Sequence, residues 1–458
     1  ANSNTVEISN TAEAEYGVST VTGGYTDYGD ANDNTVKITG TKVTQDDETT
    51  YLTSVRSDIT GGETGSGNAD GNTVTLDTIA SSGTVYGGQA GSAPSGGGQV
   101  AAAAAFTSLV VAPVDESTET DTSTEADSIA TSASGNIVTI MGSTIDGGVF
   151  GGLAGSASSN SGGTTYLTSL LAVATGDTAD TSTGTSAMSI SANDNTVTIA
   201  DSAIGSTSES AGEIGGDVYG GYAGVSAFDL YFLEGASPTI SLTASGNKVE
   251  MTNSTVSGAI YGGQTSAPTS YLSSLEDASP TITLMASGNK VEMTNSTVSG
   301  AIYGGLAGSA SSSTILRPPT NVASTSESDI VLTSFAAASS SVDAVYINNA
   351  NHNSVILKGT QTSSNVYGGY AGVSSSNNSY ITYATESLAE TSQTASTSTA
   401  DTTGGASYNQ VLIEEPAGNE TDADITGYVF SPYVYGGYAV GGTAAVPYHT
   451  NGNEVSIT

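Results

Sequence analysis

Carboxyl groups are the first candidates for chemistry in this chain. The 458 residues include 45 Asp and Glu against 7 Lys and Arg, with 2 His and no Cys. Adjacent acids occur at Asp46-Asp47-Glu48 and at Glu414-Glu415, and glycoside hydrolases cleave their substrates with a pair of carboxyl groups. Neighbouring residues of a strand point to opposite faces, however, so we interpret these acids as solvated loop residues.

Basic side chains are too few for a polysaccharide lyase, which needs a base together with Arg or Lys and usually calcium held by carboxylates. The arginines are Arg56 and Arg317. The histidines, His352 and His449, each lie just before a strand of the repeat described below and are two repeats apart, so we interpret them as turn residues. We therefore expect no enzymatic activity and no catalytic residues.

Asp-rich turns offer oxygen ligands that could bind Ca²⁺. They occur at residues 31–34, 68–72 and 193–195. None of them contains the Gly-Gly-x-Gly-x-Asp nonapeptide of calcium-binding β-rolls. We favour a turn-forming role for these residues and expect no cofactor, with calcium kept as the alternative.

The balance of charge argues against several classes of partner. The formal net charge is −38 at pH 7, and no cluster of Lys and Arg is present that could neutralise nucleic-acid phosphates or anionic lipids. The sequence has no apolar stretch of ~18 residues, so we expect no membrane insertion by this segment. The lack of Cys removes disulfides and thiolate metal sites, and it is compatible with an exported protein that folds without oxidation.

The elements that must position these groups belong to one repeated unit. Its motif, Asn-x-Val-x-(Ile/Leu/Met), occurs ten times, beginning at Asn4, Asn34, Asn72, Asn136, Asn195, Asn247, Asn289, Asn353, Asn409 and Asn453. The spacing varies widely, so the unit is constant at its start and elastic in its middle. We predict a single repeat domain over residues 1–458, with units starting near residues 4, 34, 72, 136, 195, 247, 289, 353 and 409 and a partial unit at 453–458.

A second motif, (Val/Ile)-(Tyr/Phe)-Gly-Gly, follows the first in most units. Its aromatic residues are Tyr86, Phe150, Tyr219, Tyr261, Tyr303, Tyr367 and Tyr435. The glycines would allow either a sharp turn or a close approach of neighbouring backbone. A looser third motif recurs as Tyr51–Val55 and at residues 166–170, 271–275 and 331–335, and it is also typical of a strand.

The first motif has the period of a β-strand. Its Asn, Val and Ile positions share one face, whereas the residues between them, which vary from unit to unit, point the other way. A strand of five residues cannot bury this face alone, but stacking the units at ~4.8 Å joins the apolar positions into one core. The pattern predicts an all-β fold, a parallel β-solenoid of about nine coils. The longer units would carry Ser/Thr-rich loops or hairpins that project from it.

Such a stack would place equivalent side chains directly above one another. Each inward Asn could donate a hydrogen bond to the Asn of the next coil, at a turn where Asn also tolerates left-handed backbone. The seven aromatic residues of the second motif would form another ladder beside it. We therefore predict a structural ladder of the ten Asn and the seven aromatic residues named above.

The combination of Asn-x-Val-x-Ile, Val-Tyr-Gly-Gly-Tyr-Ala and Ser/Thr-rich spacers resembles the repeat regions of bacterial autotransporter passengers and related surface adhesins. Val-Tyr-Gly-Gly-Tyr-Ala occurs at residues 218–223, 366–371 and 434–439. The resemblance implies a right-handed parallel β-helix that is displayed outside a Gram-negative cell and used for adhesion or aggregation. It implies no catalytic residues.

Three hypotheses of function follow. The first is a non-enzymatic extracellular protein at the bacterial surface, a stiff scaffold whose variable loops contact another cell-surface protein or a glycan. The second is the subunit of an extracellular filament, which self-associates by stacking its terminal coils end to end. The third, which we favour least, is a polysaccharide-active enzyme on a β-helix.

Overall fold

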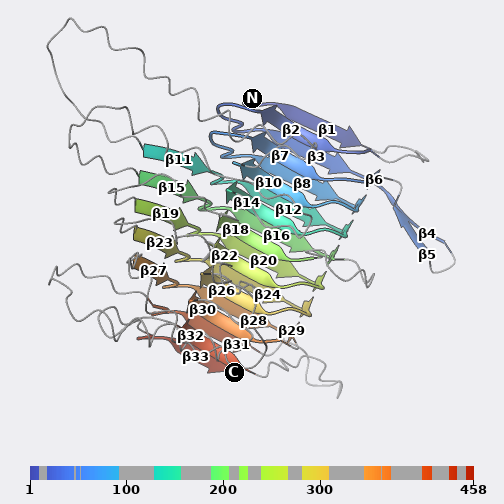
Figure 1. The fold of residues 1–458 in the computed structure, drawn as a ribbon. Coiled ribbons are helices and arrows are strands. Elements are labelled where there is room, and N and C mark those ends of the chain that lie inside the picture. Colours follow the sequence, from blue (N-terminus) through green and yellow to red (C-terminus); the bar gives the residue numbers. More distant parts are fainter. Residues whose placement is uncertain are drawn as a thin grey trace, which may run out of the picture.

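The computed structural model describes residues 1–9, 18–45, 48–51, 53–91, 128–155, 187–205, 216–224, 239–266, 281–308, 345–362, 364–372, 405–414, 433–440 and 450–457. All the secondary-structure elements in these residues are β-strands. No segment of this part of the chain forms an apolar helix long enough to span a bilayer. The strands stack into a parallel β-solenoid, with the first coil at one end and the last at the other (Figure 1).

Four parallel sheets run along the solenoid. The long sheet contains β1 (Thr5–Ser9), β3 (Thr35–Thr39), β8 (Thr73–Asp77), β12 (Ile137–Met141), β16 (Thr196–Ala200), β20 (Lys248–Thr252), β24 (Lys290–Thr294), β28 (Ser354–Lys358), β31 (Gln410–Glu414) and β33 (Glu454–Ile457). The aromatic sheet contains β2 (Val21–Thr26), β7 (Ile59–Thr64), β10 (Val85–Ala90), β14 (Val149–Gly155), β18 (Val218–Gly224), β22 (Ile260–Ser266), β26 (Ile302–Ala307), β30 (Val366–Gly372) and β32 (Val434–Val440).

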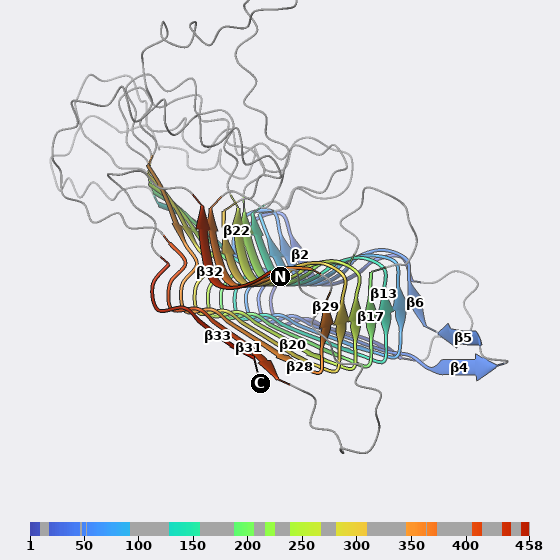
Figure 2. The same ribbon diagram turned by 90° about the horizontal axis from the view of Figure 1, so that it is seen from below.

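The other two sheets are smaller. The narrow sheet has two-residue strands, which are β6 (Ser54–Val55), β9 (Ala80–Ser81), β13 (Thr144–Ile145), β17 (Ala203–Ile204), β21 (Thr255–Val256), β25 (Thr297–Val298) and β29 (Gln361–Thr362). The side sheet consists of β11 (Ser128–Ser132), β15 (Ala187–Ser191), β19 (Thr239–Thr243), β23 (Thr281–Met285) and β27 (Val345–Asn349). In Figure 2 the chain passes along the long sheet, turns through the narrow sheet and returns through the aromatic sheet.

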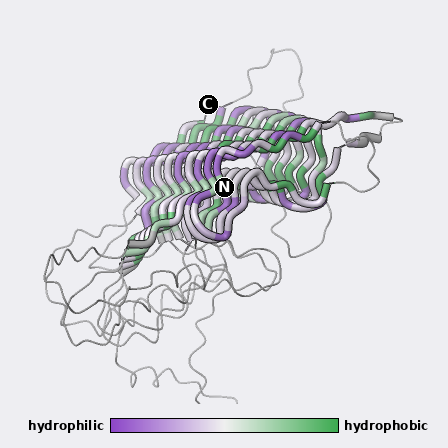
Figure 3. Tube along the Cα trace, turned by 90° about the horizontal axis from the view of Figure 1, so that it is seen from above, coloured by the Kyte–Doolittle hydropathy of each residue, from purple (hydrophilic) through white to green (hydrophobic). Residues whose placement is uncertain are grey.

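The predicted register is confirmed along the long sheet. Each of its strands begins one residue after the Asn of the first motif, and every Val of the motif pairs with the Val of the next unit. Val74, Val138 and Val197 are fully buried in one core with Ile140 and Ile199. Figure 3 shows the consequence, since residues of the same hydropathy recur at the same place in successive coils.

A second core, which the sequence analysis did not predict, lies between the side sheet and the ends of the aromatic strands. Fully or nearly fully buried alanines make up most of it, including Ala154 and Ala223 at the ends of β14 and β18. The side sheet contributes Ile190, Leu242 and Leu284. The solenoid therefore buries two parallel apolar columns.

One hairpin leaves the coil in the second unit, as the spacing of the longer units suggests. Its strands are β4 (Lys42–Gln45) and β5 (Glu48–Tyr51), paired antiparallel, and they project beyond the narrow sheet (Figure 2). The Tyr51 hydroxyl accepts a hydrogen bond from Thr144 Oγ1 at 3.2 Å. The third motif is not one strand here, because Tyr51 ends β5 and Ser54 begins β6; its other copies lie outside the described residues.

Candidate functional site

The ten predicted Asn residues form one hydrogen-bonded column along the solenoid. Each side-chain amide nitrogen donates to the amide oxygen of the next Asn, at 2.8–3.1 Å in all nine steps from Asn4 to Asn453. The same oxygen accepts the backbone N–H of the donor residue at 2.8–3.0 Å. The eight Asn from Asn34 to Asn409 are buried, so this inner ladder satisfies polar groups that would otherwise be costly to bury.

The left-handed residue of this turn lies one position earlier than predicted. It is the residue before each ladder Asn that has a positive φ, between 56° and 69°, as at Asp33, Asp194 and His352. The Asn itself begins the extended strand and uses its amide for the ladder. His352 is accordingly a turn residue, and its ring stacks on that of Tyr408 at 5.1 Å. His449 lies outside the described residues.

A second polar column runs beside the first, two residues before each Asn, and the sequence analysis missed it. Its members are Asn2, Asn32, Asp70, Ser134, Asn193, Ser245, Ser287, Asn351, Ser407 and Asn451. Each side-chain oxygen accepts the backbone N–H of the next member at 2.6–3.3 Å. The sequence signal for this column is an Asn, Asp or Ser at the same position in every unit. Any of these short side chains has an oxygen that can accept a backbone N–H of the next coil.

A serine column closes the turn between the long and the narrow sheets. The hydroxyl oxygens of Ser143, Ser202, Ser254 and Ser296 each accept a backbone N–H from the preceding coil at 3.1–3.2 Å. The residue before each of these serines has a positive φ. Both turns that flank the long sheet are therefore held by side chains that repeat from coil to coil.

The aromatic residues of the second motif stack on the outer face of the aromatic sheet. From Tyr86 through Phe150 to Tyr435, six consecutive pairs have ring centroids 4.5–5.2 Å apart and interplanar angles of 3–15°. A second row leans on their edges, as Tyr222 does on Tyr219 at 5.7 Å. Burial raises the pKa of the phenols of Tyr86, Tyr219 and Tyr261, so they stay protonated.

One carboxylate lies inside this aromatic region. The Tyr219 hydroxyl donates to Asp217 Oδ2 at 3.1 Å, and the backbone N–H of Ala259 donates to Asp217 Oδ1 at 2.7 Å. Burial raises the pKa of the Asp217 carboxyl in spite of these two hydrogen bonds. Asp217 therefore costs more to ionise in the folded protein than in water.

The glycines of the second motif are explained by close approach rather than by a turn. They lie within strands and lack a positive φ. A Cβ on Gly220 would collide with the carbonyl oxygen of Gly262 in the next coil and lie 3.0 Å from Asn247 Cβ, and one on Gly221 would meet the Asn247 amide. The aromatic sheet thus presses its backbone against the inner ladder.

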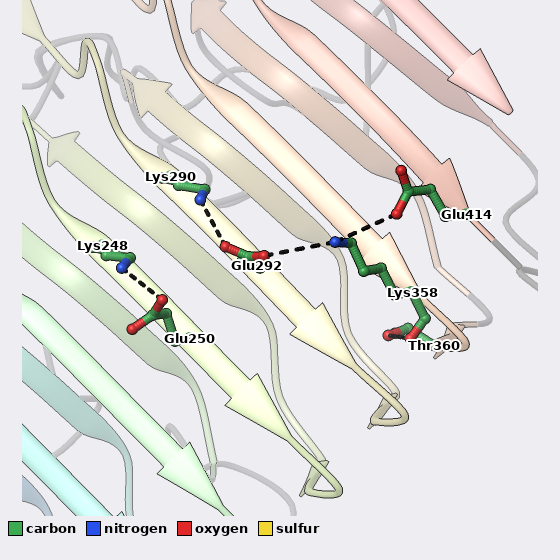
Figure 4. Close-up of polar contacts among 7 residues, drawn as sticks. All are labelled: Lys248, Glu250, Lys290, Glu292, Lys358, Thr360 and Glu414. Atoms are coloured by element: carbon green, nitrogen blue, oxygen red, sulfur yellow. Dashed lines mark hydrogen bonds and ion pairs between the residues drawn. The ribbon is translucent and has the colours of Figure 1, made fainter. Parts of the chain in front are cut away.

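The outer face of the long sheet carries most of the lysines. The first two coils contribute one ion pair, Lys37 with Glu7 at 3.3 Å. Farther along, Figure 4 shows a row of charges in which Lys290 contacts Glu292 at 2.6 Å and Lys358 joins Glu292 to Glu414. The hydrogen bond from Lys290 lowers the pKa of Glu292. These side chains are partly exposed, so each pair contributes less than about 1 kcal/mol.

The carboxylates do not assemble into a metal centre in the part of the chain that the structure describes, where no group of three or more His, Cys, Asp or Glu is placed to hold an ion. Asp70 accepts a backbone N–H of the second column, while Asp33 and Asp194 occupy left-handed turn positions. Glu414 is engaged by Lys358 at 3.4 Å. Asp46, Asp47 and Glu415 lie outside the described residues.

The fold and its repeated columns define the chain as a parallel β-solenoid repeat protein. Comparison with known proteins adds no further assignment, because no family model, no curated protein and no solved structure matches the chain.

Proposed function

We propose that this chain is a non-enzymatic protein of the bacterial surface, a stiff extracellular scaffold that presents variable segments to a protein or glycan partner. One observation carries the proposal: the coils are constant, and five of the variable segments leave them at points that line up along one corner. The resemblance to autotransporter passengers and surface adhesins supports the same function.

The constancy of the coils is seen in the long sheet, whose strands pair in register from β1 to β33. The corner lies where the aromatic strands end and the side strands begin. There the chain leaves after β10, β14, β18, β22 and β26 and returns at β11, β15, β19, β23 and β27. The intervening segments differ in length and composition: residues 225–238 are short and mostly apolar, whereas residues 91–127 are much longer and contain many Ser and Thr.

The geometry keeps these exit points in order. Consecutive strands of a parallel sheet lie ~4.8 Å apart, and residues at the corner pair in register, as Ala154 does with Ala223 and Ile190 with Leu242. Segments of unrelated length can therefore be exchanged without disturbing the core. A surface protein that diversifies its contacts on a fixed body needs this property.

The test exchanges segments at the corner within the full chain. Residues 156–186 are replaced by a copy of residues 225–238, which already connect the same two sheets one coil later. The variant should keep the β-sheet circular dichroism and thermal stability of the parent but change its adhesion to glycan arrays and cultured cells. A variant with all five segments exchanged should lose adhesion. Unchanged adhesion in that variant, or a protein confined to the cell interior by antibody labelling, would contradict the proposal.

An extracellular filament is the second candidate, and the direction of the inner ladder favours it. The inner ladder has a direction, because each Asn side chain donates its hydrogen bond to the Asn of the next coil toward the C-terminus. Its ends are therefore complementary, and one copy could continue the ladder of another.

Electron microscopy of the purified chain separates the two candidates. Filaments with a repeat equal to one solenoid length, abolished by Val455→Lys, would support end-to-end stacking, and discrete particles at all concentrations would exclude it. The third hypothesis, a polysaccharide-active enzyme, requires cleavage of acidic or neutral polysaccharides with or without calcium, and we expect none.

A further inference from the structure

A continuous row of tyrosine rings leads from the surface into the aromatic sheet. It begins at Tyr433, whose side chain is 60% exposed and stacks on Tyr435 at 6.1 Å. Tyr435 stacks on Tyr367 at 5.1 Å. The row continues through Tyr303 and Tyr261 to Tyr219, with centroids 4.7–5.1 Å apart at every step.

The row of phenols is interrupted just beyond Tyr219. The next ring, 4.5 Å away, is Phe150, which has no hydroxyl. Tyr219 is also the ring whose hydroxyl donates to a carboxylate, Asp217. Tyr367, by contrast, accepts a hydrogen bond from the Asn365 amide at 3.0 Å, and an amide is not a base.

Removal of an electron from a tyrosine makes its phenol strongly acidic, so the radical is stable only where a base takes the proton. Stacked rings in contact couple their π systems and allow an electron to move along the row. Tyr219 is buried and Asp217 is half-buried, which limits the access of water and reductants in solution to the product. An exposed entrance, Tyr433, and a half-buried proton acceptor, Asp217, thus lie at opposite ends of the row of tyrosines.

We propose that these tyrosines form a redox-active site that takes up oxidising equivalents at Tyr433 and holds the resulting radical on Tyr219. A one-electron oxidant removes one electron from the row and is itself reduced by one electron. The Tyr219 O–H bond breaks, and its proton passes to Asp217 Oδ2. The products are a neutral tyrosyl radical and a protonated Asp217. The inference is independent of the adhesive function.

Burial also raises the pKa of Asp217, which strengthens it as a proton acceptor. The chain contains no Trp, so no indole competes for the radical. The site would act on one-electron oxidants of small size, such as radicals that reach an exposed surface tyrosine.

The test uses the full chain and azidyl radicals made by pulse radiolysis, with phenoxyl radical absorbance and freeze-quenched electron paramagnetic resonance as readouts. The parent should show a long-lived radical fraction. Tyr219→Phe, which keeps the ring, and Asp217→Asn, which keeps the shape but not the base, should both lose it. Tyr433→Phe should lower the amount of long-lived radical without changing its lifetime.

Tyr222→Phe is the matched control, because Tyr222 is a buried neighbour whose ring meets Tyr219 edge-on. It should retain the long-lived fraction. Circular dichroism establishes whether each variant is folded. If Asp217→Asn does not fold, the result for Tyr219→Phe alone tests the proposal. A long-lived radical that persists in Tyr219→Phe, its loss in Tyr222→Phe as well, or its absence from the parent would overturn the proposal.

Discussion

Replacement of one buried ladder residue, Asn195→Ala, should destabilise the solenoid far more than the same change at its end. Asn195 Oδ1 accepts the backbone N–H and the side-chain amide of Asn136 at 2.9 and 3.0 Å. Its own amide nitrogen donates to Asn247 Oδ1 at 3.0 Å. All three residues are almost fully buried, so water cannot replace the lost partners.

The magnitude follows from the groups left without partners. Two buried donors of Asn136 lose their acceptor, and each such group costs about 1–3 kcal/mol. Asn247 Oδ1 still accepts the backbone N–H of Asn195 at 2.9 Å, so it adds little. We therefore expect Asn195→Ala to lower the free energy of unfolding by about 3–5 kcal/mol.

Asn4→Ala is the matched control from the same ladder. Asn4 lies in the first coil and is exposed, and Asn34 Oδ1 keeps the backbone N–H of residue 4 at 3.0 Å. The expected loss is about 0.5–1.5 kcal/mol.

Hydrogen exchange is the suitable assay, because repeat arrays need not unfold in one step. The Asn136 amide should exchange roughly 100- to 4,000-fold faster in Asn195→Ala than in the parent, since ~1.4 kcal/mol corresponds to a factor of ten. Equal effects of the two substitutions, or a loss below ~1 kcal/mol in Asn195→Ala, would refute the reasoning.

Three further predictions concern the other columns. Gly220→Ala should lower the free energy of unfolding, measured by thermal unfolding, by about 1–3 kcal/mol or more, because the added Cβ meets the Gly262 carbonyl oxygen. Gly288→Ala is the control, because there only the positive φ opposes Ala. An effect of Gly220→Ala no larger than that of Gly288→Ala would contradict the prediction. Tyr261→Leu should cost about 1–3 kcal/mol in urea unfolding, because it breaks two stacked pairs, and a neutral effect would count against the aromatic column. Asp217→Asn should be more stable than the parent at neutral pH. The raised pKa of Asp217 makes its contribution greatest below its ordinary pKa, and that contribution is lost as pH rises through the folded value. The difference in melting temperature should therefore shrink on acidification, and a difference independent of pH would exclude this cause.

The sequence alone was sufficient to predict the long sheet, and the reasons lie in the first motif. Asn-x-Val-x-Ile alternates with period two, so one unit is enough to predict the buried face. The motif occurs ten times with the same internal spacing, so the strands of successive units are expected to align in register. Val74, Val138 and Val197 accordingly share one core.

The side sheet could not be read in the same way. Its strands differ from unit to unit, as Ala187–Ser191 does from Val345–Asn349, and most of its core is alanine from other elements. Alanine is common in loops as well as in cores, so it gives no periodic signal. The second polar column was also missed, because Asn, Asp and Ser replace one another freely where only an acceptor oxygen is needed.

The role of the glycine pair in the second motif could not be predicted from the sequence either. The sequence left a sharp turn and a close approach as alternatives for the glycine pair, and only the contact of Gly221 with the Asn247 amide decides between them. The sequence does not single out the pairing of Tyr219 with Asp217, because Gly148, Ala259 and Asn365 replace the acid at the same place in other units.

Disulfide trapping tests the in-register stack most directly, because the chain has no Cys of its own. Thr75 and Thr139 pair across neighbouring strands, and Thr198 lies one strand farther. Neighbouring parallel strands are ~4.8 Å apart, within the reach of a disulfide, whereas a separation of two strands, about 10 Å, is not. Under mild oxidation Thr75→Cys with Thr139→Cys should form an intramolecular disulfide, and Thr75→Cys with Thr198→Cys should remain reduced. The opposite result, or equal yields from both pairs, would contradict the stacked solenoid.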